Sequence, residues 1–161
     1  MIDKTKPVLI IAIGAPGSGK STWWEEGLKN GSIPPQAVRI NMDTIRKEMT
    51  GDEANQTINQ VVYKVAENKL RAFLSERIPV IYWDNTCSKP KARKSIIELA
   101  KEAKYNILGV LWDLPLEVCL KRNKSRKRVV PEEYIANMHA NIKINPPRKE
   151  EGFNDIIVIT N

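Results

Sequence analysis

Short, nearly continuous apolar runs recur along the chain and are separated by longer stretches of mixed polarity. Most of these runs are rich in Val, Ile and Leu, which is typical of strands that are buried on both faces of a parallel sheet. We expect five strands, at Val8–Ile13, Val38–Asn41, Val80–Asp84, Ile107–Asp113 and Asp155–Ile159.

The stretches between the runs have helical patterns, with Pro90 and Pro131 at positions that suit a first turn. Alternating strands and helices predict an α/β fold with a doubly wound, mainly parallel sheet of four to five strands, flanked by helices. Ligands bind beyond the carboxyl ends of such strands, so the chemistry is expected just after each strand. We find no repeat or linker and expect one domain over residues 1–161. The expected helices are Lys20–Lys29, Thr44–Met49, Glu53–Ser75, Lys89–Ala103, Leu116–Lys121 and Pro131–Ile142.

The composition narrows the class of protein and of partner. The 161 residues carry a net charge of +7 with a pI near 9.4, which favours a polyanionic partner. No run of 18 apolar residues is present and the first strand begins near the N-terminus, so we expect neither a membrane partner nor a signal peptide. Cys87 and Cys119 match no metal or redox motif, and we expect free thiols in a cytoplasmic protein. The oligomeric state stays open.

The first expected strand runs into Gly14-x-x-x-x-Gly19-Lys20-Ser21, the pattern of a phosphate-binding loop (P-loop). Glycines let the backbone wrap around an anion, and the start of the next helix supplies unpaired N–H groups. Lys20 would reach the β- and γ-phosphates of ATP or another NTP, and Ser21 would bind Mg²⁺. The alternative is a glycine-rich turn without a ligand. The nucleotide-binding residues are predicted to be Gly14, Ala15, Pro16, Gly17, Ser18, Gly19, Lys20, Ser21 and Thr22.

Asp43 and Arg46 follow the second expected strand and lie three positions apart, so they share one face of a first helical turn. A carboxylate at this edge of the sheet can accept a proton from an acceptor hydroxyl, and an arginine beside it can hold an acceptor phosphate. The alternatives are a helix N-cap for Asp43 and a surface ion pair for Arg46.

Asp84 ends the third expected strand, where P-loop NTPases place an acidic residue that binds Mg²⁺ directly or through water. A turn-initiating aspartate is the alternative. The next residue is Asn85, whereas many ATP-driven motors have a glutamate there that activates water. We therefore do not expect a motor ATPase, and the lack of an Asn-Lys-x-Asp motif argues against a GTPase switch.

Residues 121–128, the lid, read Lys-Arg-Asn-Lys-Ser-Arg-Lys-Arg. Arg122 and Arg126 would point the same way if this segment is helical, and they could close over the phosphates and stabilise charge on the transferred group. A solvated face or a nonspecific nucleic-acid patch is the alternative interpretation.

Four segments in order resemble the kinase domain of bacteriophage-type polynucleotide 5′-hydroxyl kinases, which belong to the P-loop kinases related to adenylate kinase. The segments are GAPGSGKSTW at 14–23, INMDTIR at 40–46, WDNTCSKPKARK at 83–94 and LKRNKSRKRVVP at 120–131. Two features depart from the pattern of that family. Trp83 replaces a serine, and Asn85-Thr86 reverses the expected order.

The resemblance implies transfer of the γ-phosphoryl of ATP to the 5′-hydroxyl end of DNA or RNA, as in nucleic-acid end repair. It implies that Lys20 and Ser21 hold ATP and Mg²⁺, that Asp43 is the general base, and that Arg126 stabilises the transition state. Arg122 matches a basic lid position, so both lid arginines join the nucleotide-binding set. The acceptor site would consist of Arg46, which engages a 3′-phosphate, with Asp84 and Thr86.

Several expectations remain open beside this hypothesis. The chain could instead phosphorylate a nucleoside or another small molecule, or bind nucleic acid under NTP control without any transfer. Trp83 could stack on an acceptor base or pack at the edge of the sheet, and Trp23 or Trp24 could contact a base or pack in the core. Lys89, Lys91, Arg93 and Lys94 could follow a nucleic-acid backbone or only face solvent. No Asp-x-Asp-x-Thr motif occurs in the chain, so we expect no 3′-phosphatase activity.

Overall fold

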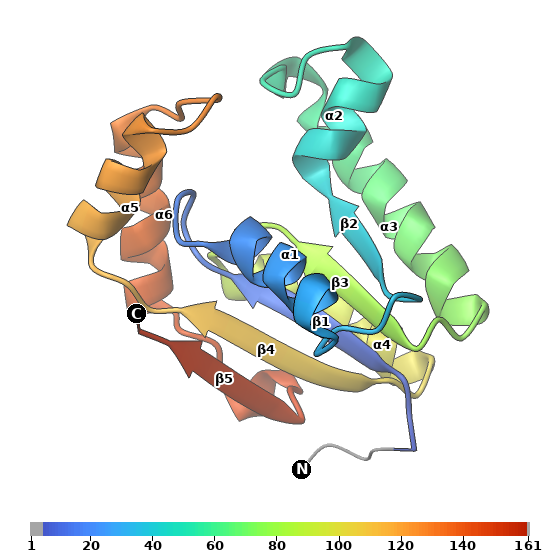
Figure 1. Ribbon diagram of the computed structural model, residues 1–161. Helices are drawn as coiled ribbons and strands as arrows, with labels where there is room; N and C mark the ends of the chain where they lie inside the picture. Colours follow the sequence, from blue (N-terminus) through green and yellow to red (C-terminus); the bar gives the residue numbers. More distant parts are fainter. Residues whose placement is uncertain (1–4, 161) are drawn as a thin grey trace.

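Five parallel strands form the central sheet of this protein, in the order β2-β3-β1-β4-β5. The computed structural model describes residues 5–160, so residues 1–4 and 161 of the expected domain lie outside the described part. Figure 1 shows the sheet with helices on both of its faces. The strands are β1 (Val8–Ile13), β2 (Val38–Asn41), β3 (Val80–Asp84), β4 (Asn106–Trp112) and β5 (Asp155–Ile159). The predicted doubly wound α/β fold is confirmed.

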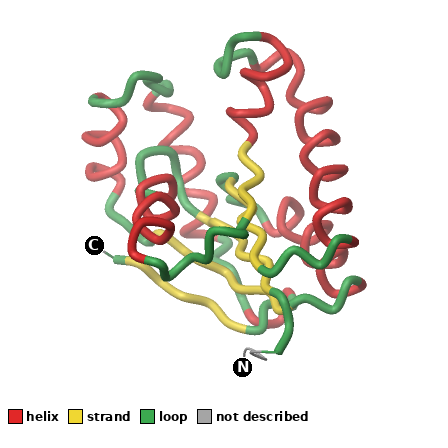
Figure 2. The backbone as a smooth tube through the Cα atoms, turned by 45° about the vertical axis from the view of Figure 1, so that its right-hand side comes forward, coloured by secondary structure: helices red, strands yellow, loops and turns green. Residues whose placement is uncertain are grey.

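The helices alternate with the strands along the chain (Figure 2). The α-helices are α1 (Lys20–Asn30), α2 (Met42–Thr50), α3 (Asn59–Ser75), α4 (Pro90–Glu102), α5 (Leu116–Lys124) and α6 (Glu132–Ile144), with short 3-10 helices η1 (Gln56–Ile58) and η2 (Lys149–Glu151). The predicted helix over Glu53–Ser75 is wrong at its start. The Asn55 side chain accepts a hydrogen bond from the Thr57 N–H and caps η1 as a separate turn before α3.

Alternate side chains of the strands pack into two hydrophobic layers, one on each face of the sheet. The α1 face contains Ile10 of β1 and Tyr82 of β3, and the ring of Trp24 stacks on Tyr82 with centroids 5.1 Å apart. The opposite face is larger and joins the sheet to α3 and α4; its members include Leu9, Ile11, Ile81, Trp83, Leu70 and Ile96. Burial on both faces explains why the strand sequences are almost continuously apolar.

Polar residues collect where the parallel strands end. The P-loop follows β1, α2 follows β2, and Asp84 ends β3, so all three lie at one edge of the sheet. Figure 1 shows α5 and α6 rising beyond this edge on one side and α2 on the other. The fold thus brings the ends of three neighbouring strands to face the lid.

Candidate active site

The P-loop has the backbone that an anion site requires. Gly17 and Gly19 have φ values of 82° and 107°, in the left-handed region that glycine tolerates. Helix α1 begins at Lys20 without a side-chain cap, so the N–H groups of its first turn have no partner within the helix. These groups and the positive end of the helix dipole can hold the phosphates of a nucleotide.

Gly17 also allows the P-loop to contact α5. A Cβ atom at this position would lie 2.5 Å from the carbonyl oxygen of Cys119, a separation that side chains do not tolerate. Any other residue would push the loop away from the helix that carries the first part of the lid. The packing of α5 against the P-loop therefore depends on this glycine.

Lys20 extends back over the P-loop. Its Nζ atom donates hydrogen bonds to the carbonyl oxygens of Gly14, at 2.8 Å, and Ala15, at 3.0 Å. Burial lowers the pKa of Lys20 below its ordinary value; the carboxylate of Asp84 opposes this shift, and the positive charge of Arg126 adds to it. The ammonium is thus held inside the loop, where a triphosphate would compensate for its lost hydration.

Asp84 is buried at the end of β3 and accepts hydrogen bonds from two residues of the neighbouring strand β2. Its Oδ2 atom accepts hydrogen bonds from Arg39 Nε at 2.9 Å and from Asn41 Nδ2 at 2.8 Å. Arg39 Nη2 forms an ion pair with the same oxygen. Arg39 Nη2 also donates to Ser21 Oγ at 2.8 Å. Arg39 therefore links the start of α1 to Asp84, a role that the sequence analysis missed.

The oxygen atoms around Arg39 fit the predicted Mg²⁺ site. Ser21 offers a hydroxyl oxygen, and Asp84 Oδ1 has no hydrogen-bond partner within residues 5–160. Mg²⁺ prefers oxygen ligands and is commonly held by one or two protein groups together with waters and substrate phosphates. When bound, the ion would neutralise charge on the β- and γ-phosphates.

Asp43 lies in the first turn of α2, but the N-cap of this helix is Asn41, whose side-chain oxygen accepts the Thr44 N–H at 2.9 Å. The alternative interpretation of Asp43 as a helix cap is therefore wrong. The Asp43 carboxylate faces the cavity and pairs through Oδ1 with Arg46 Nη1 at 2.5 Å. Arg46 also donates from Nε to Asn59 Oδ1 at 2.9 Å, which ties it to the start of α3.

The lid is only partly helical, because α5 ends at Lys124. Arg122, inside the helix, donates from Nη1 to the Ser18 carbonyl oxygen at 3.3 Å. Arg126 follows the helix end, so the condition under which it would point the same way as Arg122, a helical segment from one to the other, is not met. The side chain of Arg126 lines the cavity and has no hydrogen bond or ion pair with any residue from 5 to 160.

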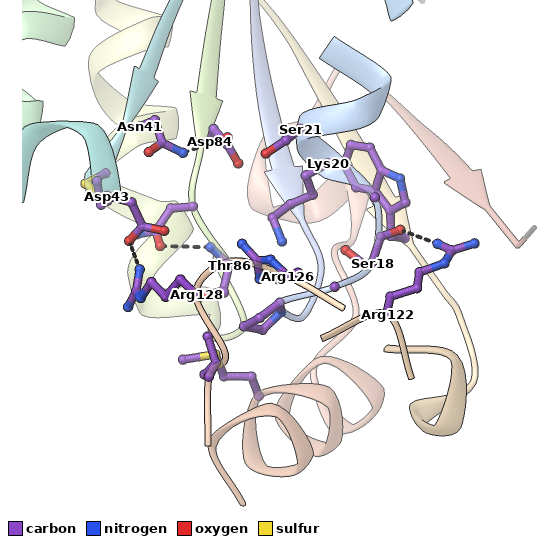
Figure 3. A pocket seen from close by; sticks show the side chains of 18 of the residues that line it. Ser18, Lys20, Ser21, Asn41, Asp43, Asp84, Thr86, Arg122, Arg126 and Arg128 are labelled. Carbon is purple, nitrogen blue, oxygen red and sulfur yellow. Dashed lines mark hydrogen bonds and ion pairs between the residues drawn. The ribbon is translucent and has the colours of Figure 1, made fainter. Parts of the chain in front are cut away.

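Arg128 reaches across the cavity from the lid and was also missed in the sequence analysis. Its Nη1 atom lies 2.6 Å from Asp43 Oδ1, and Figure 3 shows this ion pair together with the contact between Arg122 and Ser18. A sequence signal existed for Arg128, because it belongs to the basic run. The sequence analysis considered only Arg122 and Arg126 of this run, the pair that lies four positions apart.

One cavity of about 1010 Å³ brings most of the predicted residues together. Gly14 and Ala15 do not line the cavity, but their carbonyl oxygens accept the hydrogen bonds of Lys20 Nζ. Ligand pockets are typically about 300–1,000 Å³, so this one has room for a nucleotide and part of a second substrate. The predicted residues that line it are Pro16, Gly17, Ser18, Gly19, Lys20, Ser21, Thr22, Asp43, Arg46, Asp84, Thr86, Arg122 and Arg126.

Two of the nucleic-acid contacts that the sequence left open are excluded because the side chains are fully buried. Trp83 packs in the core with its ring edge-on to Tyr63, at a centroid distance of 6.0 Å, and no base can stack on it. Arg93 forms an ion pair with Glu151 at 2.7 Å and donates to the Cys87 carbonyl oxygen at 3.0 Å. The structure thus assigns Arg93 to the packing of α4 against η2.

Trp23 and Trp24 differ in their surroundings. Trp24 lies on the buried face of α1, as expected for a core residue. Trp23 lines the cavity and packs against Trp112 with ring centroids 5.9 Å apart.

No helix within residues 5–160 is long and apolar enough to span a bilayer.

The chain belongs to the AAA domain family AAA_33, whose model matches residues 9–144. It is 26% identical to the L-seryl-tRNA(Sec) kinase of Methanococcus maripaludis over 140 residues, which are 82% of this chain and 51% of that protein. It is 27% identical to the transcription factor bHLH140 of Arabidopsis thaliana over 162 residues, which are 96% of this chain and 16% of that one. The chain thus spans about half of the first relative and about a sixth of the second.

Among solved structures, a chain of the Pnkp1/Rnl/Hen1 RNA repair complex superimposes with a TM-score of 0.73 and 26% identity, covering 86% of this chain and 45% of that one. A second structure of the Pnkp1/Rnl/Hen1 complex gives a TM-score of 0.62 and 29% identity, covering 78% and 42%. The chain is therefore a kinase-like P-loop NTPase domain, and its fold and relatives support a phosphotransferase.

Proposed function

We propose that this protein transfers the γ-phosphoryl group of ATP to the 5′-hydroxyl end of DNA or RNA. The position of Asp43 carries this proposal. Its carboxylate lines the same cavity as the P-loop, and arginines from α2 and from the lid surround it. A kinase needs a proton acceptor in the cavity that holds the γ-phosphate, whereas a module that only binds nucleic acid does not.

The proposed reaction assigns one role to each group. Asp43 accepts the proton of the 5′-hydroxyl as its oxygen bonds to the γ-phosphorus, while the bond from that phosphorus to the bridging oxygen of ADP breaks. Lys20 and the N–H groups of α1 hold the phosphates, and Arg126, whose side chain has no partner among the described residues, stabilises charge on the transferred group. Arg46 and the residues at the end of β3 hold the acceptor.

The basic surface and the relatives support nucleic acid as the acceptor. The net charge is +7, and the lysines that flank the buried Arg93 (Lys89, Lys91 and Lys94) are exposed beside the end of β3. Contacts of this kind follow a phosphate backbone without reading its sequence. The similarity to a chain of an RNA repair complex points in the same direction.

The similarity to L-seryl-tRNA(Sec) kinase favours a second candidate, a kinase for a small hydroxyl compound or for a hydroxyl group attached to tRNA. Such an enzyme would use the same P-loop and the same base. It would differ in what Arg46 and the lysines after Asp84 contact.

The test is a panel of acceptors incubated with γ-labelled ATP and Mg²⁺. The panel contains a 5′-hydroxyl DNA oligonucleotide, the matched RNA, a nucleoside 3′-monophosphate, a plain nucleoside and seryl-tRNA. We expect label at the 5′ ends of the oligonucleotides, less on the nucleoside 3′-monophosphate and almost none on the nucleoside. Oligonucleotide binding should weaken as salt rises, because lysines and arginines displace condensed counterions.

Other patterns of label would select another function. Label on the nucleoside or on seryl-tRNA alone would support the small-hydroxyl kinase. Salt-sensitive binding of the oligonucleotide with no label on any acceptor would support a binding module. The Lys20→Met variant is the matched control for label that does not come from this P-loop.

A further inference from the structure

The cavity has two walls, and an ion pair joins them. One wall is α2, which carries Asp43 and Arg46; the other consists of the lid and α6. The ion pair between Arg128 and Asp43 crosses from one wall to the other, as Figure 3 shows. Both side chains are only partly exposed, at 20% and 36%.

The two arginines at Asp43 bind the same atom. Arg46 Nη1 and Arg128 Nη1 lie 2.5 and 2.6 Å from Oδ1, while Oδ2 has no hydrogen-bond or ion-pair partner among residues 5–160. Cations on one oxygen fix the plane of a carboxylate and leave the lone pairs of the other oxygen available. In the proposed reaction, the available oxygen is the one that must meet the acceptor hydroxyl.

The arginines differ in the structure that supports them. Arg46 belongs to the same helix as Asp43 and is tied to Asn59, so it stays with the base whether the cavity is open or closed. Arg128 comes from the lid and can hold Asp43 only when the lid lies against α2. Of these two contacts, only the one with Arg128 depends on lid closure.

We propose that Arg128 is a positioning residue that orients the general base from the lid, so that the site is fully assembled only when the lid is closed. This inference rests on the proposed kinase function. With Oδ1 held by both arginines, Oδ2 takes the proton of the acceptor hydroxyl as the new oxygen–phosphorus bond forms and ADP leaves. Lid closure over the phosphates and activation of the acceptor are thereby coupled through one side chain.

The kinetic test compares Arg128→Ala with Lys127→Ala, the removal of a neighbouring exposed cation that does not line the cavity. We expect Arg128→Ala to lower kcat by about 10- to 100-fold, the scale on which a misplaced catalytic group costs rate. The KM values for ATP and for the oligonucleotide should change by less than about 3-fold. Lys127→Ala should keep the wild-type kcat, and Arg128→Lys should recover part of the loss.

Two further comparisons separate positioning from substrate binding. In an Asp43→Asn background, Arg128→Ala should have no further effect on kcat, because its target is already lost. Acceptors with and without a 3′-phosphate should show the same loss. Wild-type kcat in Arg128→Ala, or a raised KM confined to acceptors with a 3′-phosphate, would overturn the proposal; the second result would make Arg128 a ligand of the acceptor.

A distance measurement tests the contact without any phosphate transfer. Cys87 and Cys119 are buried, so spin labels on Lys47→Cys in α2 and Glu133→Cys in α6 should attach specifically. We expect a narrow distance distribution with Arg128 and a broader, longer one with Arg128→Ala. An identical distribution in both would show that Arg128 does not hold the walls together, even if the wild type labelled no acceptor and the proposed function failed.

Discussion

The base of the cavity and its lid hold their charged residues in different ways. The base, called the floor below, consists of the P-loop and the ends of β2 and β3, with Lys20, Arg39 and Asp84. On the floor, Lys20 donates to two carbonyl oxygens, and Asp84 is buried against Arg39 and Asn41. On the lid, the side chain of Arg126 is exposed without a partner among residues 5–160, and Arg128 binds a residue on the opposite wall. The charged groups of the floor are therefore held by partners within the floor, whereas on the lid the Arg126 side chain remains available to a substrate and Arg128 is held by the opposite wall.

This contrast separates two kinds of effect. Substitutions in the floor are expected to lower stability where they leave a buried charge without its partner, and to impair transfer where they remove a group that holds the phosphates. Substitutions in the lid are expected to alter rate with little cost in stability, because exposed ion pairs contribute only about 0–1 kcal/mol. The predictions below test this division, from the largest effect to the smallest.

The largest effect is expected for Lys20→Met, which removes the charge and keeps most of the length. Transfer should fall by about 10³-fold, the upper range for the loss of one electrostatic contact to the transition state. The melting temperature should not fall, because burial lowers the pKa of Lys20 and its charged form is costly in the free protein. Steady-state kinetics and thermal unfolding check the two parts. Wild-type turnover would disprove the P-loop assignment.

Arg126→Ala is expected to lower kcat by about 10²-fold and to change the KM for ATP only slightly, because an arginine that acts on developing charge contributes mainly in the transition state. Arg122→Ala is the matched comparison, since Arg122 is already bound to the Ser18 carbonyl oxygen. A larger loss of kcat in Arg122→Ala would exchange the two assignments.

On the floor, Arg39→Ala should destabilise the fold by about 3 kcal/mol, because it leaves the buried Asp84 carboxylate without its ion-pair partner. The melting temperature should then fall by about 6–12 °C for a domain of this size. The double variant Arg39→Ala/Asp84→Asn should recover part of this loss. Unchanged melting of Arg39→Ala would show that the fold does not depend on this pair.

The smallest effect is expected at high pH. Burial raises the pKa of Cys87 from 9.0 to about 12. Between these values the unfolded chain has lost the thiol proton while the folded protein retains it, so stability should decrease as pH rises. The contribution is at most about 1.4 kcal/mol per pH unit. Urea unfolding at pH 8.5 and 10.5 should show a steeper decrease for the wild type than for Cys87→Ala; equal slopes would contradict the assignment.

Most of the fold could be predicted because its signals are local. The apolar runs give β1, β2, β3 and β5 their observed ends, and β4 is displaced by only one residue at each end. Helix α2 begins earlier than predicted because the cap is Asn41 and not a residue closer to the predicted start. Caps of this kind depend on one side-chain rotamer, which the pattern of apolar residues does not contain.

The residues of the site differ in how far the sequence could predict them. The P-loop could be predicted because its residues are contiguous and their spacing is specific. Arg39 and Arg128 were missed because their partners, Asp84 and Asp43, lie far away in the sequence. Arg39 had a usable signal, since it lies two residues before Asn41 on β2 and so shares its face. The pairing of β2 with β3, which gives that face its meaning, exists only in the folded sheet.

The central claim is that Asp43 is the base that activates a 5′-hydroxyl group. Single-turnover transfer from ATP to a 5′-hydroxyl oligonucleotide, measured for Asp43→Asn beside the wild type, tests it most directly. The account predicts that the rate of transfer falls by at least about 10²-fold while the affinities for ATP and oligonucleotide stay close to those of the wild type. A collapse of ATP affinity would make Asp43 a structural or metal-binding residue, and an unchanged rate would contradict its role as the base.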